Sequence, residues 1–144
     1  MIDKQEFYHG AAIVRLLEYQ DFKTIKKYDN GYLINEEAYI FFKYTTKNRS
    51  PWRFTLSQAE IERLNAVAEI YKKSIIALIC AGDGICAISW KDGNDILGDS
   101  AGWISARRNF NKYYSVAGSI GVLKRKVSSQ QWPSIIFNPV FILE

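Results

Sequence analysis

The apolar run at 74–80, Ser-Ile-Ile-Ala-Leu-Ile-Cys, is the feature that most constrains the fold of this chain. It is far shorter than the roughly 20 residues that a membrane-spanning helix needs. An apolar run of this length without alternation is typical of a strand that is covered on both faces. The sequence therefore predicts a layered fold in which this strand lies inside a sheet.

Two helices with capping signals are expected in the first half of the chain. An Asp-x-x-Glu pattern near the start, followed by apolar residues at helical spacing, predicts a helix over about 3–20. Ser57 and Glu60 form a Ser-x-x-Glu capping box, and the apolar spacing behind them predicts a second helix over about 58–72. This second helix directly precedes the apolar run.

Three strand-like segments lie between these helices, at 22–28, 32–35 and 38–46. The Asp-Asn-Gly sequence at 29–31 contains Asn-Gly, which is the strongest short hairpin signal, so the three segments are expected to form an antiparallel meander. The helix between the strand at 38–46 and the strand at 74–80 provides the crossover that a parallel pair requires.

The rest of the chain is expected to add antiparallel strands. The strand after the apolar run is followed by an acidic, glycine-rich loop with at most one helical turn, and the apolar tail is expected to be an irregular or edge segment. The predicted segments are the return strand at 85–90, the loop at 91–100, strands at 103–108, 113–118 and 122–127, and the tail at 132–144.

These elements predict a fold of the mixed α+β or α/β class. A mixed β-sheet with helices on both faces is expected in the order α-β-β-β-α-β, and C-terminal antiparallel strands either extend this sheet or form a lobe beside it. A chain of 144 residues is expected to form a single domain, residues 1–144. Its core is predicted at 3–90 and its strand extension at 103–144.

Positive charge is concentrated in two parts of the chain. The sequence has 19 basic and 15 acidic side chains, which gives a net charge of +4. Residues 22–56 contain seven basic and three acidic side chains, and residues 103–144 contain six and one. This distribution favours a polyanionic partner; the alternative is solvated strand faces on which charges cluster by chance.

Cysteine and histidine usage excludes some functions. Two Cys and one His cannot supply a four-ligand zinc site, and the N-terminus has no signal-peptide pattern, so a cytoplasmic protein without a membrane segment is expected. Cys80 and Cys86 are expected to be buried, reduced thiols, with a disulfide across their turn as the alternative. His9 is expected at the surface or at the boundary of the core, with a general base as the alternative.

The α-β-β-β-α-β order of residues 3–90 resembles the core of the PD-(D/E)XK, or restriction-endonuclease-like, superfamily. The resemblance implies an Asp at the second strand and a Glu-x-Lys on the third, which hold a divalent metal and position water. Lys43 matches the lysine, whereas Phe41 stands at the acidic position. Asp29 and Glu37 are the candidate carboxylates, so the candidate catalytic residues are Asp29, Glu37 and Lys43.

The resemblance therefore implies a nuclease-like scaffold whose metal site is degraded or relocated. Glu6 or Glu18 would supply the acid that the first helix often contributes, and Glu36 is another candidate for a relocated acid. Mg²⁺ is expected only if the chain is an active nuclease, and the metal ligands are unknown.

A basic segment at 43–55 is the first candidate for nucleic-acid contacts. Its cations alternate with aromatic residues and hydroxyls, which suits phosphate contacts together with stacking of Trp52 on a base. The alternative is a solvated loop whose Trp52 fills the core. Two further basic clusters, at 105–114 and 124–126, are expected to share one face as a plain exposed ribbon or as a phosphate-binding ribbon. The predicted contacts are Lys43, Lys47, Arg49, Trp52, Arg53, Arg107 and Arg108.

Three functional hypotheses follow, in this order. The first is a nucleic-acid-associated protein on a nuclease-like core, which binds DNA or RNA without robust catalysis; an active metal-dependent nuclease is its weaker variant. The second is a non-enzymatic interaction or assembly module, including a homodimer, that uses the aromatic C-terminal strands. The third is a small-molecule binder with a pocket beside Lys43.

Overall fold

The computed structural model describes residues 1–138, and this part of the chain contains four helices and eight strands. The helices are α1 (Lys4–Leu17), α2 (Gln58–Ile70), α3 (Trp90–Leu97) and α4 (Gln131–Phe137). The strands are β1 (Ile25–Tyr28), β2 (Gly31–Ile34), β3 (Ala38–Thr45), β4 (Trp52–Leu56), β5 (Lys73–Cys80), β6 (Gly84–Ser89), β7 (Gly102–Arg107) and β8 (Ser115–Gly118).

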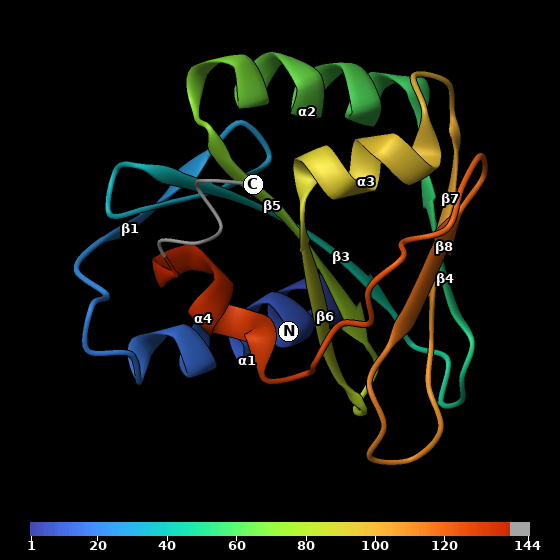
Figure 1. Cartoon of the computed structure of the whole chain (residues 1–144). Coiled ribbons are helices and arrows are strands. Elements are labelled where there is room, and N and C mark those ends of the chain that lie inside the picture. The colour runs from blue at the N-terminus through green and yellow to red at the C-terminus, as the bar shows by residue number, and fades with distance from the viewer. Residues whose placement is uncertain (139–144) are drawn as a thin grey trace.

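The strands form two sheets, which confirms the mixed fold class (Figure 1). The larger sheet has the order β1-β2-β3-β5-β6, in which β3 and β5 are parallel and the other pairs are antiparallel. The smaller sheet has the order β4-β7-β8 and is antiparallel. The crossover through α2 joins β3 to β5, as the sequence predicts.

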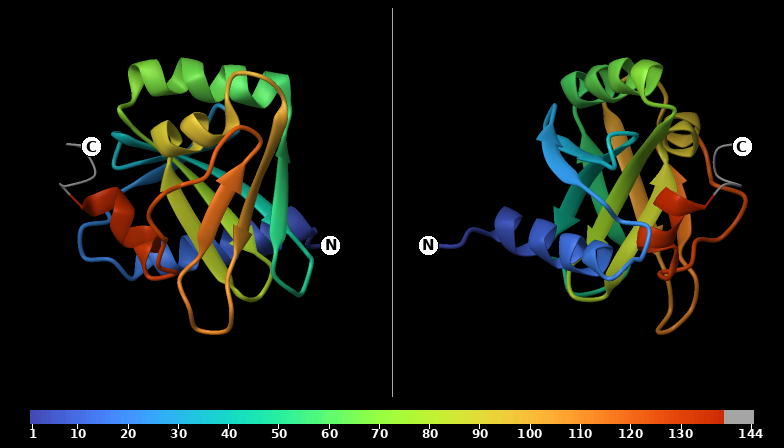
Figure 2. Two further views of the ribbon diagram at one scale, coloured as in Figure 1. Left: turned by 45° about the vertical axis from the view of Figure 1, so that its right-hand side comes forward. Right: turned by 90° about the vertical axis from the view of Figure 1, so that its left-hand side faces the viewer.

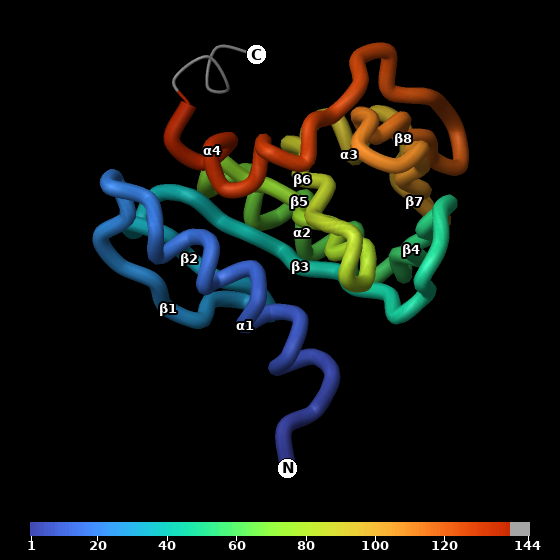
Figure 3. Tube along the Cα trace, turned by 90° about the horizontal axis from the view of Figure 1, so that it is seen from below, coloured from blue at the N-terminus to red at the C-terminus, as the bar shows by residue number. Residues whose placement is uncertain are grey.

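The five-stranded sheet separates two hydrophobic clusters. On one face, Tyr39 and Phe41 of β3 pack with α2, α3 and the inner side of the three-stranded sheet. On the other face, Ile40 and Phe42 pack with α1 and α4. Successive side chains of a strand point to opposite faces, so an apolar β3 must be covered twice. Figure 2 shows α2 and α1 on opposite sides of the sheet, and Figure 3 shows α1 and α4 on the same side.

Both predicted capping boxes are present. At α1, the Asp3 side chain accepts a hydrogen bond from the Glu6 backbone, and the Glu6 side chain accepts one from the Asp3 backbone. At α2, Ser57 Oγ accepts from the Glu60 backbone N–H at 3.1 Å, and Glu60 Oε1 accepts from the Ser57 N–H at 2.9 Å. These bonds satisfy backbone donors that the first helical turn leaves free.

The β1–β2 hairpin turns one residue earlier than the Asn-Gly signal indicates. Tyr28 pairs with Gly31, so Asp29 and Asn30 form the two-residue loop, with φ of 46° and 63°. Positive φ at both positions is the conformation of a type I′ turn. Gly31 lies in β2, where a Cβ would come within 2.7 Å of the hydroxyl of Tyr39, so this strand position requires glycine.

The C-terminal strands form a separate sheet with β4 and do not extend the larger one. The prediction of a strand at 122–127 is wrong. Only two isolated bridges form there, Ala117 with Val122 and Tyr114 with Val127. The two bridges are out of register with each other, so no continuous ladder can form between them.

Residues 90–97 form the helix α3, where the sequence predicted a loop with at most one helical turn. The Ser89 side chain caps this helix by accepting from the Asp92 N–H at 3.1 Å. Gly93 lies inside α3, although glycine is a poor helix former. A Cβ at Gly93 would lie 3.1 Å from the Trp90 ring, so its absence allows the indole to pack against the helix backbone.

The apolar tail is helical over 131–137, which corrects the prediction of an irregular or edge segment; residues 139–144 of this predicted segment lie outside the described residues. Trp132 and Ile135 are buried in the cluster beneath α1, and Trp132 Nε1 donates to Ala12 O at 3.1 Å. In residues 1–138, no helix is long and apolar enough to cross a membrane.

Candidate functional site

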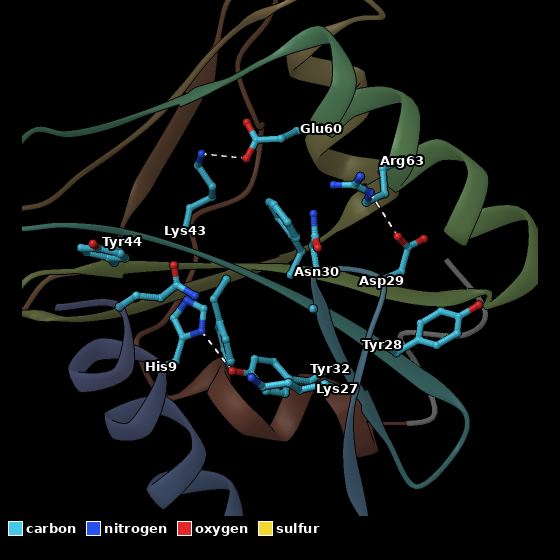
Figure 4. A pocket seen from close by; sticks show the side chains of 14 residues that line it. His9, Lys27, Tyr28, Asp29, Asn30, Tyr32, Lys43, Tyr44, Glu60 and Arg63 are labelled. Atoms are coloured by element: carbon cyan, nitrogen blue, oxygen red, sulfur yellow. Dashed lines mark hydrogen bonds and ion pairs between the residues drawn. The ribbon is translucent and has the colours of Figure 1, made fainter. Parts of the chain in front are cut away.

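A polar pocket of about 690 Å³ opens between α2, the end of β3, the β1–β2 turn and the start of α1 (Figure 4). We call it the α2–β3 pocket. The side chains that carry its chemistry come from elements far apart in the sequence, because the meander brings the β1–β2 turn beside the end of β3. They are Gln5, His9, Lys27, Asp29, Asn30, Tyr32, Lys43, Glu60 and Arg63.

Lys43 and Glu60 form the central ion pair of the pocket. Lys43 follows Tyr39 and Phe41 on one face of β3 but lies at the open end of the strand, where its Nζ is 3.0 Å from Glu60 Oε2. The side chains are 23% and 26% exposed. Burial alone would raise the pKa of Glu60, but hydrogen bonds from Ser57 and Lys43 outweigh it and hold that pKa below its usual value. Glu60 thus caps α2 and holds Lys43 at once.

Glu60→Gln should lower the free energy of unfolding at pH 7 by about 1 kcal/mol, because Gln keeps the capping bond but not the charge opposite Lys43. Since the folded-state pKa of Glu60 lies below its unfolded value, its contribution is present above that unfolded value and is lost as the pH falls through the folded one. Unfolding free energies between pH 7 and pH 3 should therefore fall less steeply in the variant than in the wild type.

The control for this prediction is Glu69→Gln, which removes an exposed glutamate from the other end of α2. Its pH dependence should match that of the wild type. Identical slopes for Glu60→Gln and the wild type would mean that the Lys43 pair does not contribute to stability.

Asp29 and Arg63 form a second ion pair at the rim of the pocket. Arg63 Nε lies 3.1 Å from Asp29 Oδ1, and both side chains are more than a third exposed. The carbonyl oxygen of Asp29 accepts a hydrogen bond from the buried Tyr39 hydroxyl at 2.7 Å. The core of the sheet therefore fixes the turn that presents the Asp29 carboxylate.

His9 lies on α1 and closes the pocket from below. Its Nδ1 is 3.1 Å from the Tyr32 hydroxyl, and its ring packs against Phe42. Burial lowers the pKa of His9, Asp3 opposes this effect and Lys27 adds to it. The imidazole is therefore neutral at pH 7, and its contacts place it at the boundary of the core, which agrees with the predicted surface or boundary position.

The predicted catalytic residues come together only in part. Asp29 and Lys43 both line the α2–β3 pocket, but Glu37 precedes β3 and pairs with Lys73 at 3.8 Å. Six residues of extended strand place Glu37 about 20 Å from Lys43. Glu37 is therefore not a member of this site.

Trp52 lies in the core, which removes it from the predicted nucleic-acid contacts. The residue is 3% exposed, and its Nε1 donates to Lys47 O at 2.9 Å. Alternation along β4 explains this position, because Trp52, Phe54 and Leu56 all point inward. Lys47 and Arg49 remain exposed in the loop that joins β3 to β4.

The remaining predicted cations lie on the three-stranded sheet. Arg53 is exposed on β4 and stacks over the Trp103 ring at 4.4 Å, while Arg107 is exposed at the end of β7. The Arg108 side chain is only 10% exposed and forms an ion pair with Asp83 at 2.8 Å. Arg108 thus holds the loop after β7 in place, and Arg53 and Arg107 do not line the α2–β3 pocket.

Cys80 and Cys86 are free and buried, as predicted. Cys80 pairs with Gly84 and Cys86 with Leu78, so the two thiols are not opposite each other on the β5–β6 ladder. Burial, with a smaller contribution from Asp83, raises the pKa of Cys80 to about 12, and burial raises the pKa of Cys86 well above its usual value. Both thiols therefore stay protonated and are poor nucleophiles.

Sequence reasoning missed Glu60 and Arg63 as site residues. Glu60 was recognised only as half of a capping box, and Arg63 follows it by three residues on the same side of α2. The sequence signal for the pair is a capping glutamate with a cation one turn later. That signal does not predict which strand the helix will face.

No protein family, curated protein or solved structure matches this chain. The pocket must therefore be interpreted from its own chemistry. The resemblance implies a carboxylate-held divalent metal, but residues 1–138 contain no group of three His, Cys, Asp or Glu side chains that would hold one. Asp29 and Glu60 are each bonded to a cation, so this donor set does not fit the implied metal centre.

Proposed function

We propose that the protein binds nucleic acid and that the α2–β3 pocket contacts a phosphate of the strand without robust metal-dependent cleavage. One observation carries the proposal: three cationic side chains, Lys27, Lys43 and Arg63, come from three different elements and line one open pocket. The element order of the larger sheet, with its parallel β3–β5 pair, is also the order on which the resemblance to nucleases rests.

The ion pairs in the pocket are compatible with phosphate binding. Partly exposed pairs such as Arg63 with Asp29 are worth at most about 1 kcal/mol, so a phosphate oxygen competes with the carboxylate at little cost. Arg binds phosphate through two parallel N–H bonds, and Lys43 adds a point charge from the strand side. Asn30 lies between the two pairs in Figure 4 and adds a neutral amide.

The test is a binding titration of labelled duplex and single-stranded oligonucleotides at several salt concentrations. The double variant Lys43→Gln with Glu60→Gln removes the lysine and its partner together, so the net charge of the chain stays unchanged. We expect it to weaken binding of every sequence alike and to flatten the salt slope by about one phosphate contact. The matched control is Lys26→Gln with Glu36→Gln, an exposed pair outside the pocket lining.

The same samples with Mg²⁺ or Mn²⁺ should show absent or very weak cleavage, because both pocket carboxylates are held by cations. Robust cleavage that the Lys43 and Glu60 double variant abolishes would overturn this part of the proposal. Absence of binding at low salt would overturn the nucleic-acid function itself.

A second candidate is association with another protein. The observation that favours it is an exposed apolar face on α1, which carries Phe7, Val14 and Leu17. These residues follow helical spacing on the side opposite the buried Ala12 and Leu16. This face adds α1 to the aromatic C-terminal strands as a candidate contact surface, and failure of oligonucleotide binding would favour the hypothesis.

A further inference from the structure

A hollow of about 820 Å³ lies beside the loop that joins β7 to β8, which Figure 1 draws in orange at the bottom. We call it the β7–β8 hollow. Its lining includes four cationic side chains, Arg107, Arg108, Lys112 and Lys126, and no acidic one. We infer that this hollow is a binding site for single-stranded nucleic acid; the inference rests on the proposed function and adds a second contact surface and a strand preference to it.

The base of the hollow is rigid. Arg108 Nη2 donates to Asp83 O at 3.1 Å and its Nη1 donates to Lys112 O at 3.2 Å, so one guanidinium ties the loop to the β5–β6 turn. The Tyr114 N–H and C=O both bond to Val127, which ties the loop to the segment that follows β8. A site that is already ordered loses less conformational entropy when it binds.

Three of the four cations are available to a ligand. Arg108 is bonded to Asp83, whereas Arg107, Lys112 and Lys126 make no ion pair within the part of the chain that the structure describes. Unpaired cations gathered around a hollow without a carboxylate produce a local positive potential. This potential attracts a polyanion, and the polyanion does not have to displace a protein carboxylate before it binds.

Exposed aromatic rings accompany these cations and point to a single strand. Tyr113 lines the hollow and is 60% exposed, and Phe110 on the same loop is 86% exposed. Bases of a single strand stack on such rings while cations follow the phosphates, and this stacking does not depend on sequence. In a duplex the bases are already stacked inside the helix, so the rings would contribute little.

The outer face of the three-stranded sheet continues the same surface. Arg107 lies two residues from Ser105 on one face of β7, and Ser105 pairs with Arg53 of β4. Arg53 in turn stacks over the half-buried Trp103. Cations and an aromatic ring therefore extend from the hollow along the sheet, which gives a strand a continuous track away from the loop.

The experiment measures affinities for a labelled 15-nucleotide oligo-dT and for a mixed-sequence duplex of the same length, at several salt concentrations. The variants are Arg107→Gln with Lys126→Gln, and Phe110→Ala with Tyr113→Ala. Lys72→Gln removes an exposed lysine between α2 and β5 that does not line the hollow, and it is the control. Folding of each variant is verified first by its unfolding midpoint.

The wild type should bind the single strand more tightly than the duplex. The charge variant should flatten the salt slope on the single strand by about 0.7 for each cation removed. The aromatic variant should lose about five- to 150-fold in affinity for oligo-dT per stacked base and change little on the duplex. Lys72→Gln should behave as the wild type.

Failure of the inference and failure of the proposed function give different results in this experiment. If the wild type binds but both hollow variants bind equally well, the inference is wrong and the proposed function stands. Equal losses on duplex and single strand in the aromatic variant would overturn the strand preference. A wild type that binds neither oligonucleotide would overturn both the inference and the proposed function.

Discussion

Tyr39→Ala should lower the free energy of unfolding by about 3–5 kcal/mol, which is the usual cost of deleting a large buried aromatic side chain. Tyr39 is fully buried in the cluster between the two sheets, and its ring meets that of Tyr28 edge-on at 6.1 Å. The substitution removes this packing and leaves a cavity beneath the β1–β2 turn. Chemical denaturation monitored by circular dichroism would measure the change.

The control is Tyr39→Phe, which keeps the ring and removes only the hydrogen bond to Asp29 O. Burial raises the pKa of Tyr39, so the hydroxyl remains a donor throughout the neutral range. We expect Tyr39→Phe to cost about 1–2 kcal/mol, since it leaves one carbonyl without a partner. If both variants lowered the free energy of unfolding by the same amount, the hydrogen bond to the turn, and not the packing of the ring, would account for the contribution of Tyr39.

Arg108→Ala should destabilise the fold by about 2 kcal/mol, because it removes charge-assisted hydrogen bonds from a partly buried ion pair. The guanidinium bonds to Asp83 and to two backbone carbonyls and lies over the Tyr114 ring at 4.4 Å. The Tyr114 hydroxyl also donates to Asp83 at 2.7 Å, so the carboxylate would keep only one of its two partners.

Arg108→Lys separates charge from geometry, because Lys keeps the charge but cannot form the forked set of bonds. We expect Arg108→Lys to lower the free energy of unfolding less than Arg108→Ala does, but still below the wild-type value. A double-mutant cycle with Asp83→Asn should give a coupling of about 1–3 kcal/mol. If Arg108→Ala left the unfolding free energy unchanged, Arg108 would return to the set of phosphate contacts that the sequence predicted.

Local signals predicted most of the larger sheet. The apolar run in β5, the capping box at Ser57 and the turn at 29–31 each act within a few residues. Together they predicted the order of α1, α2 and the five strands of the larger sheet, but not β4, which belongs to the smaller sheet. The helix α3 was not predicted, because glycine at position 93 disfavours a helix. The reason for this glycine, the Trp90 ring packed against the helix backbone, is visible only in the structure. Tertiary packing overrides propensity there.

The candidate site was predicted less completely, and for a related reason. The resemblance and the basic segment both identified Lys43, but its partner Glu60 is determined by where α2 crosses the sheet. The same limit applies to Trp52, whose basic neighbours suggested a binding loop. The indole of Trp52 points into the core because β4 pairs with β7, and this pairing is not visible in the local sequence.

The sheet order leaves β1 at one edge of the larger sheet, and that edge has consequences for how the protein behaves at high concentration. An unpaired strand edge is a template for strand addition and aggregation, and short, charged edges resist it. β1 has four residues, and its adjacent lysines, Lys26 and Lys27, place a positive charge on each face. A second copy that approached this edge would meet like charges on both sides, so the strand that supplies a cation to the pocket also keeps neighbouring molecules from joining the sheet.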